Sequence, residues 1–147
     1  MTQPTDILSF VRKYLIRHGL EAEIIVLGQR SERESGLEFS ITPKKSGAVG
    51  ISVLVTPLPG DRYEIDIFLG SDDTPIEISG PINVNRQGNH LALDELADVL
   101  DSVCNGEVYE ELDNGGQSLG FNIWDPERPL GSDNVEAARR RTFAAWS

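Results

Sequence analysis

The sequence predicts an α+β domain in which an antiparallel meander of strands carries helices on one face. Three observations lead to this fold class. Apolar residues recur every three or four positions near the N-terminus and again around residue 95, which is typical of amphipathic helices. Several runs between these segments alternate apolar and polar residues, the period of half-buried strands. The connections between those runs are too short for helical crossovers, so neighbouring strands should be antiparallel.

The first helix is predicted over residues 5–18. Thr5 can cap its free N–H groups, and Gly19 can end it in a left-handed conformation. Its spacing gives one apolar face, formed by Ile7, Leu8, Val11, Tyr14 and Leu15. We expect this face to pack on the sheet.

Four strand-like runs follow, at residues 22–28, 37–42, 51–56 and 63–69. The first is dense in Ile and Val, and the other three alternate apolar and polar side chains. Residues 76–78 and 82–84 are candidates for short additional strands. The intervening Gly80-Pro81 argues against one long strand there, because proline cannot donate to a ladder.

A central helix is predicted from Asn89, a possible N-cap, to Gly106, a possible C-terminal stop. A hairpin should follow, with strands at residues 107–112 and 117–123. Its turn, residues 113–116, contains Asn-Gly and Gly-Gly, which adopt positive φ at little cost.

The C-terminal part is predicted to end in a third helix. Residues 125–129 hold two prolines and should run extended. Ser132 or Asp133 could then cap a helix that places its three consecutive arginines near its C-terminus, where the helix dipole favours cations. These arginines are Arg139, Arg140 and Arg141.

Length and charge limit the function classes. A chain of 147 residues is most simply one domain, spanning residues 1–147. The net charge is −11, and residues 61–136 hold 18 acidic but only 3 basic side chains, which gives −15. Such a field disfavours nucleic acid and anionic membranes and attracts basic partners.

The remaining composition points to a soluble cytoplasmic protein. No apolar stretch approaches membrane-spanning length, and the N-terminus has no pattern of a secretory signal. Cys104 is the only cysteine, so an intramolecular disulfide is impossible. It lies on the apolar face of the central helix, as expected for a core thiol in a reducing compartment.

No catalytic or metal-binding pattern is present. The two histidines and Cys104 do not have zinc-ligand spacing, and turn chemistry accounts for Asp72-Asp73. The chain has no Gly-rich phosphate loop before a helix and no nucleophile-elbow motif. We therefore expect a protein that is not an enzyme and that needs no cofactor and no metal.

Two acidic features are the candidate binding site. Asp94, Asp98 and Asp101 are spaced to share the polar face of the central helix, which is either a solvated face or a stripe that meets a basic partner. In the next strand Tyr109 shares a face with Glu107 and Glu111. That patch suits protein recognition, although an edge strand that uses charge against aggregation is an equal alternative.

With these features, the chain resembles the small acidic immunity proteins of bacterial toxin–immunity systems. The resemblance lies in size, acidic character, α+β order and the stretch Val-Leu-Asp-Ser-Val-Cys-Asn-Gly-Glu-Val-Tyr-Glu-Glu-Leu at residues 99–112. It implies a monomer that neutralises a cognate protein toxin by covering its active site. We then expect the partner-binding residues to be Asp94, Asp98, Asp101, Glu107, Tyr109 and Glu111.

An alternative resemblance is to class I type III secretion chaperones. These are small and acidic, and the predicted order of helix, strands, helix, two strands and helix is similar to theirs. Residues 115–119, Gly-Gly-Gln-Ser-Leu, followed by alternating apolar residues, fit the second hairpin of these chaperones. This resemblance implies a dimer that holds an extended effector segment against apolar strips.

Overall fold

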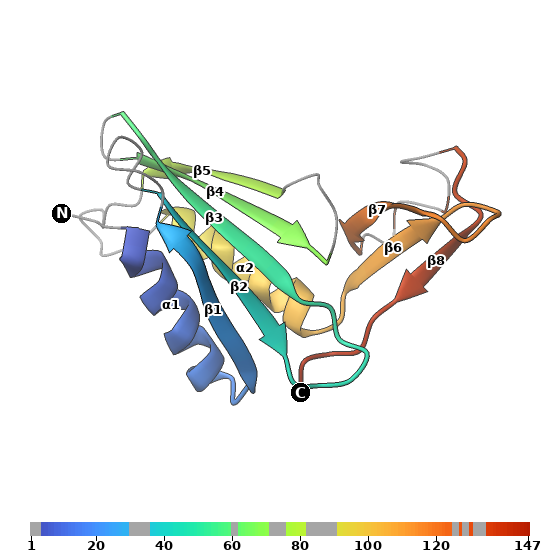
Figure 1. Cartoon of the computed structure of the whole chain (residues 1–147), viewed down its shortest axis with the longest axis horizontal. Helices are drawn as coiled ribbons and strands as arrows, with labels where there is room; N and C mark the ends of the chain where they lie inside the picture. Colours follow the sequence, from blue (N-terminus) through green and yellow to red (C-terminus); the bar gives the residue numbers. More distant parts are fainter. Residues whose placement is uncertain are drawn as a thin grey trace.

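The computed structural model describes residues 4–29, 36–59, 62–70, 76–81, 91–124, 127, 130 and 135–147. In this part of the chain, two helices accompany two separate antiparallel sheets, so the α+β class is confirmed (Figure 1). The elements are α1 Pro4–Arg17, β1 Ala22–Gln29, β2 Leu37–Pro43, β3 Ile51–Leu58, β4 Arg62–Leu69, β5 Ile76–Pro81, α2 Leu91–Cys104, β6 Val108–Leu112, β7 Ser118–Ile123 and β8 Arg139–Thr142.

The larger sheet is the predicted meander, with strand order β1-β2-β3-β4-β5 and each pair antiparallel. Burial alternates along β2 and β3 as the sequence pattern predicts, with one face fully covered. Rows of apolar side chains such as Phe39, Val53 and Ile67 lie next to one another on that face and are inaccessible to solvent.

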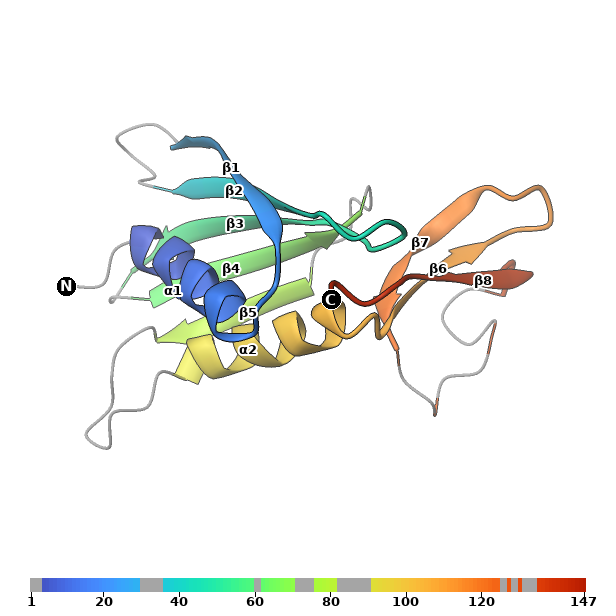
Figure 2. The ribbon, with the colours of Figure 1, turned by 90° about the horizontal axis from the view of Figure 1, so that it is seen from below.

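Both helices cover the same face of this sheet (Figure 2). Helix α1 lies against β2 and β3, α2 lies against β5, and the helices contact each other. The apolar face of α1 is buried as expected, with Ile7 and Val11 fully covered. The helix begins at Pro4, one residue before the expected cap, because proline is well suited to a first helical turn.

Strand β5 includes the Gly80-Pro81 pair and ends there, so it is longer than the candidate strand at residues 76–78. Gly80 lies opposite Tyr63 and Pro81 opposite Arg62. The strand tolerates proline because it is the last strand of the sheet, where a missing donor can face away from the neighbour.

The predictions of a third helix and of a single sheet are both wrong. The hairpin forms as expected, but β6 is the middle strand of a second sheet with order β7-β6-β8 (Figure 1). The predicted helical arginines lie in β8, where Arg140 is opposite Glu111 and Arg141 is opposite Glu110. Attraction between opposite charges on adjacent strands, together with ladder hydrogen bonds, outweighs the local helical spacing.

The C-terminal residues after β8 join the two sheets. The Trp146 side chain is buried, and its ring N–H donates to the Val49 carbonyl oxygen at 3.0 Å. The Trp146 backbone N–H donates to the Cys104 carbonyl oxygen at 2.9 Å, at the end of α2. The C-terminal segment therefore contacts both the β2–β3 connection and the junction between α2 and β6.

Gly106 ends α2 as the sequence predicts. Because it has no side chain, it also lets the C-terminal segment pack closely against it. Its φ is +75°, and the Glu107 N–H donates back to the Ser102 carbonyl at 2.8 Å. A side chain at Gly106 would place its Cβ atom 2.9 Å from the backbone of both Phe143 and Ala145.

Several expected features lie outside the described residues. They are the N-cap Asn89, the Asp72-Asp73 turn, the candidate strand at residues 82–84 and the caps Ser132 and Asp133. Among the described residues, neither helix has the length and apolar character needed to cross a membrane.

Replacing Gly106 by alanine should destabilise the protein more than replacing Gly19. Both glycines have positive φ, but a Cβ atom at Gly19 meets nothing within 4 Å. We expect Gly19→Ala to lower the free energy of unfolding by about 1 kcal/mol and Gly106→Ala by about 2–4 kcal/mol. Urea unfolding followed by circular dichroism measures both values. Equal losses would mean that the C-terminal segment does not pack closely at Gly106.

Candidate functional site

The exposed side of α2 carries the acidic residues that the sequence singles out. Leu96, Leu100 and Val103 are fully buried, so the positions between them face solvent. Asp94, Asp98 and Asp101 are exposed, as expected, and so is Glu95, which the sequence interpretation omitted. We call these four residues the acidic face. Helix α2 contains no Lys, Arg or His to neutralise them.

Asp101 differs from the other members of the acidic face because it also connects the two helices. Its Oδ1 atom accepts a hydrogen bond of 2.5 Å from the Tyr14 hydroxyl of α1. Hydrogen bonds to a charged acceptor stabilise a fold more than neutral ones, by about 1.5–3 kcal/mol. Asp101 is therefore a structural residue as well as part of an exposed charge.

Tyr14 and Cys104 are held in their neutral forms at this helix contact. Burial, followed by the hydrogen bond to Asp101, raises the pKa of the Tyr14 hydroxyl above its ordinary value. Burial, followed by the charge of Asp101, raises the pKa of the Cys104 thiol to about 12. A thiol that stays protonated at neutral pH is a poor nucleophile and metal ligand, so Cys104 acts as a core residue.

The expected exposed patch around Tyr109 is wrong for two of its three residues. Glu107 is exposed, but Tyr109 is 0% exposed and Glu111 is 5% exposed. The reason is β8, which covers the side of β6 that would otherwise be an edge. Tyr109 and Glu111 therefore belong to the interior of the second sheet, and they offer no surface for a partner.

Arg140 contacts three side chains of the second sheet and its flank, namely Tyr109, Trp124 and Glu111. Its guanidinium lies 4.1 Å from the centre of the Tyr109 ring and 5.4 Å from the Trp124 ring. Tyr109 and Trp124 meet edge to face at 5.7 Å. The Arg140 Nε atom is 4.0 Å from Glu111 Oε2, an ion pair between two largely buried side chains. The sequence offers one signal for this pairing, two adjacent glutamates in one strand and three arginines in another.

The other face of the same sheet is more open. Arg141 Nη1 is 3.8 Å from Glu110 Oε1, and Arg141 remains mostly exposed. A hollow of about 540 Å³ lies beside them, lined by Glu110, Leu112, Gly116, Ser118, Arg139, Arg140, Arg141 and Thr142. Glu110 neutralises part of the positive charge of the three arginines, so the hollow is a weakly basic depression in the surface.

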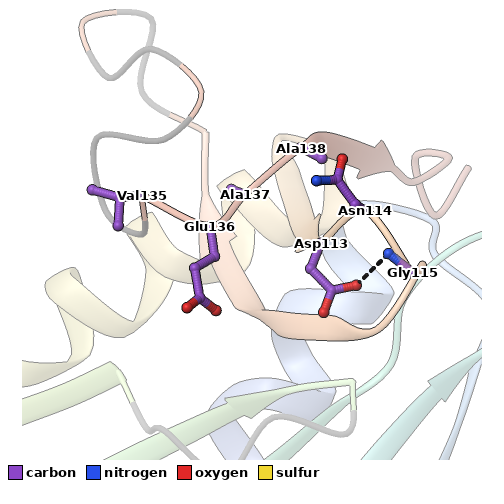
Figure 3. Close-up of a pocket in the computed structure, with 7 residues that line it drawn as sticks. All are labelled: Asp113, Asn114, Gly115, Val135, Glu136, Ala137 and Ala138. Atoms are coloured by element: carbon purple, nitrogen blue, oxygen red, sulfur yellow. Dashed lines mark hydrogen bonds between the residues drawn. The ribbon is translucent and has the colours of Figure 1, made fainter.

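A second hollow, of about 640 Å³, lies between the hairpin turn and the segment that leads to β8 (Figure 3). In Figure 3 the Asp113 side chain points toward Gly115 of the hairpin turn, and its Oδ1 accepts the Gly115 N–H at 2.9 Å. The same atom accepts the Gln117 N–H at 2.9 Å. Asp113 thus stabilises the hairpin turn, and this use of its carboxylate accounts for its position without a ligand.

Among the described residues, no group of three or more His, Cys, Asp or Glu side chains is placed to hold a metal ion. Comparison of the chain with protein-family models, with curated proteins and with solved structures gave no match. Among the described residues, the acidic face of α2 and Glu107, beyond the helix end, form an exposed surface of one charge sign.

High pH should destabilise the protein through Cys104 and Tyr14. Both groups have raised pKa values in the folded state, so their stabilising effect is complete below the unfolded pKa values, near 9 and 10, and is lost above them. We expect the free energy of unfolding to fall by about 1–2 kcal/mol between about pH 8 and pH 10.5. Urea titrations under reducing conditions measure it. The Cys104→Ala and Tyr14→Phe variants should each show a shallower decline, and a slope identical to wild type would contradict this assignment.

Charge reversal at Asp98 and at Asp101 should have opposite effects on stability. Asp98→Lys removes a repulsion with Asp94 one turn earlier, so the free energy of unfolding should rise by about 0.2–0.5 kcal/mol. Asp101→Lys removes the acceptor of the Tyr14 hydroxyl and should lower it by about 1–3 kcal/mol. Thermal melts of the two variants provide the comparison. A stable Asp101→Lys protein would show that the Tyr14 contact is dispensable.

Proposed function

We propose that this chain is an acidic protein inhibitor of the immunity type, which neutralises a basic protein toxin by laying the acidic face of α2 over its active site. The observation that carries this proposal is the exposure of Asp94, Glu95 and Asp98 on a helix that has no basic residue. Glu107 extends the same sign of charge just past the end of the helix.

Repulsion between Asp94 and Asp98 opposes the helix, although Asp94 in the first turn also gains from the helix dipole. Asp94 and Asp98 are one turn apart, and such like-charge pairs destabilise a helix by a few tenths of a kcal/mol. Solubility needs surface charge of either sign and does not require a single sign along one helix face. A face of one sign suits the steering of an oppositely charged partner.

The distribution of acids supports a single binding face. The buried glutamates of β6, Glu110 and Glu111, are opposed by arginines of β8. In the part of the chain that the structure describes, the acids of α2 have no arginine strand beside them and lie at the surface. Asp94 and Asp101 are about 10 Å apart along the helix axis, so the acidic face can span a substrate groove of a small enzyme.

A double charge reversal tests this function. Asp94→Lys/Asp98→Lys should abolish binding of the basic protein that wild type captures from its native host at low salt. Wild-type binding should weaken at least tenfold from about 50 mM to about 500 mM NaCl. The matched control is Glu21→Lys/Glu23→Lys, which changes the net charge equally at exposed positions away from α2.

The captured protein is then expressed in cells, and growth is measured with and without this chain. If it is a toxin, co-expression of wild type or of the Glu21→Lys/Glu23→Lys control should restore growth, and Asp94→Lys/Asp98→Lys should not. Capture that is insensitive to salt, or that survives the α2 reversal, would contradict an inhibitor that acts through the acidic face.

A secretion chaperone of the class I type III kind is the second candidate. One observation favours it, the exposure of three consecutive apolar residues on β1, which an extended segment of a partner could cover. They are Ile25, Val26 and Leu27. The chain ends in a strand and an extended segment where the chaperone order ends in a helix. A complex of two chains with one extended segment, stable in high salt, would favour this candidate.

A further inference from the structure

We propose that the free edge of β1 pairs antiparallel with β1 of a second copy of this chain, which would join two five-stranded sheets into one. The inference concerns a surface other than the acidic face. It also departs from the monomer that the sequence favours, because the sequence does not show which strand lies at the edge of the sheet.

The edge position of β1 is the first observation. β1 pairs with β2 on one side, and no described strand pairs with its other side. An edge strand presents unpaired N–H and C=O groups, which proteins usually protect by charge, proline or distortion. The other edges show such protection, since β5 ends at Pro81, β7 contains Gly120 at φ +128° and β8 is Arg-Arg-Arg-Thr.

Between Glu23 and the bulge near its end, β1 has neither charge nor proline to protect its edge. Its residues 24–29, Ile-Ile-Val-Leu-Gly-Gln, include no charge. Ile25, Val26 and Leu27 are 45%, 46% and 54% exposed. A bulge lies between Val26 and Gly28, so the regular pairing surface is residues 22–26, with Leu27 just beyond it.

The exposed residues point to a strand as the occupant. Val26 lies opposite Phe39, on the side of the sheet that faces the core, and Ile25 lies opposite Ser40, on the other side. A helix packed on one face would cover only one of them. A strand added at the edge places side chains on both sides and also satisfies the free backbone groups.

The sequence of β1 suits a second copy as that strand, because antiparallel pairing about Ile25 would place Ile24 opposite Val26 and Glu23 opposite Leu27. Two chains of net charge −11 repel each other, but the excess acid lies in residues 61–136, and residues 1–60 hold 7 basic and 6 acidic side chains. With Ile25 or Val26 on the twofold axis, the two Glu23 side chains would be four to six residues apart, or about 14–20 Å. This exceeds the screening length at physiological salt, about 8 Å.

The dimer leaves the acidic face available. Helix α2 packs against β5, at the opposite edge of the sheet from β1. Two chains joined at β1 would therefore carry two acidic faces at the far ends of a continuous sheet. High salt should strengthen this association, because it screens the repulsion between the chains and the contact itself is apolar. Binding through α2 has the opposite salt dependence, so the two proposals fail independently.

Sedimentation velocity from about 5 µM to about 500 µM protein, at about 50 mM and about 500 mM NaCl, tests this interface. We expect the mass to move from one chain toward two with rising concentration, and further in high salt. Val26→Lys should weaken the dimer by about tenfold or more. The matched control is Val135→Lys, the same substitution at a side chain that is 93% exposed, and it should dimerise like wild type.

Hydrogen exchange of the wild-type protein supplies a second measurement that needs no variant. Amides of residues 22–26 that do not pair with β2 should exchange more slowly at about 500 µM than at about 5 µM. A monomer at every concentration, or a dimer that Val26→Lys leaves intact, would overturn the proposal. Protection of these amides only when an extended segment of another protein is bound would also overturn it and would assign the β1 edge to that segment.

Discussion

The arrangement of the two sheets depends on the burial of Trp146. Its ring N–H and its backbone N–H each donate to a carbonyl oxygen, one before β3 and one at the end of α2. A third bond, from the Ala144 N–H to the Gly47 carbonyl at 2.9 Å, fixes the residues between Trp146 and β8. Loss of a buried donor would leave a desolvated carbonyl and cost about 1–3 kcal/mol. The close approach at Gly106 means that this segment has little freedom to shift.

The position of β8 follows from this anchor, and the position of β8 decides which acids are exposed. With β8 in place, Arg140 lies over Tyr109 and beside Glu111, and Arg141 lies beside Glu110. Removing one member of the buried Arg140–Glu111 pair would leave an uncompensated charge in the interior. The carboxylates of β6 are thus paired with arginines inside the second sheet. The carboxylates of α2 remain exposed. The candidate binding surface therefore keeps the helix residues and Glu107 but loses Tyr109 and Glu111.

Local patterns predict much of this fold. The periods of 3.6 and 2 identify both helices and the strands of the meander, and the turn residues identify the hairpin. The terminal strand could not be found in this way, because its partner β6 is about 30 residues earlier and the pairing is set by contacts across that distance. The extension of β5 to Pro81 could not be predicted for a similar reason, since proline is tolerated there only because β5 lies at an edge of the sheet. For the site, helical spacing identifies Asp94 and Asp98 as exposed. It cannot show that β8 covers Tyr109, or that Tyr14 approaches Asp101 from another helix.

We propose that the exposed side of α2 is the surface that a basic protein partner covers. Amide chemical-shift mapping by NMR, with the partner captured at low salt added to isotope-labelled protein, tests it most directly. The predicted result is a continuous set of perturbed amides from Asp94 to Glu107, with those of Tyr109 and Glu111 little changed. Perturbations centred on the β8 arginines or on β1, with α2 unaffected, would contradict the claim.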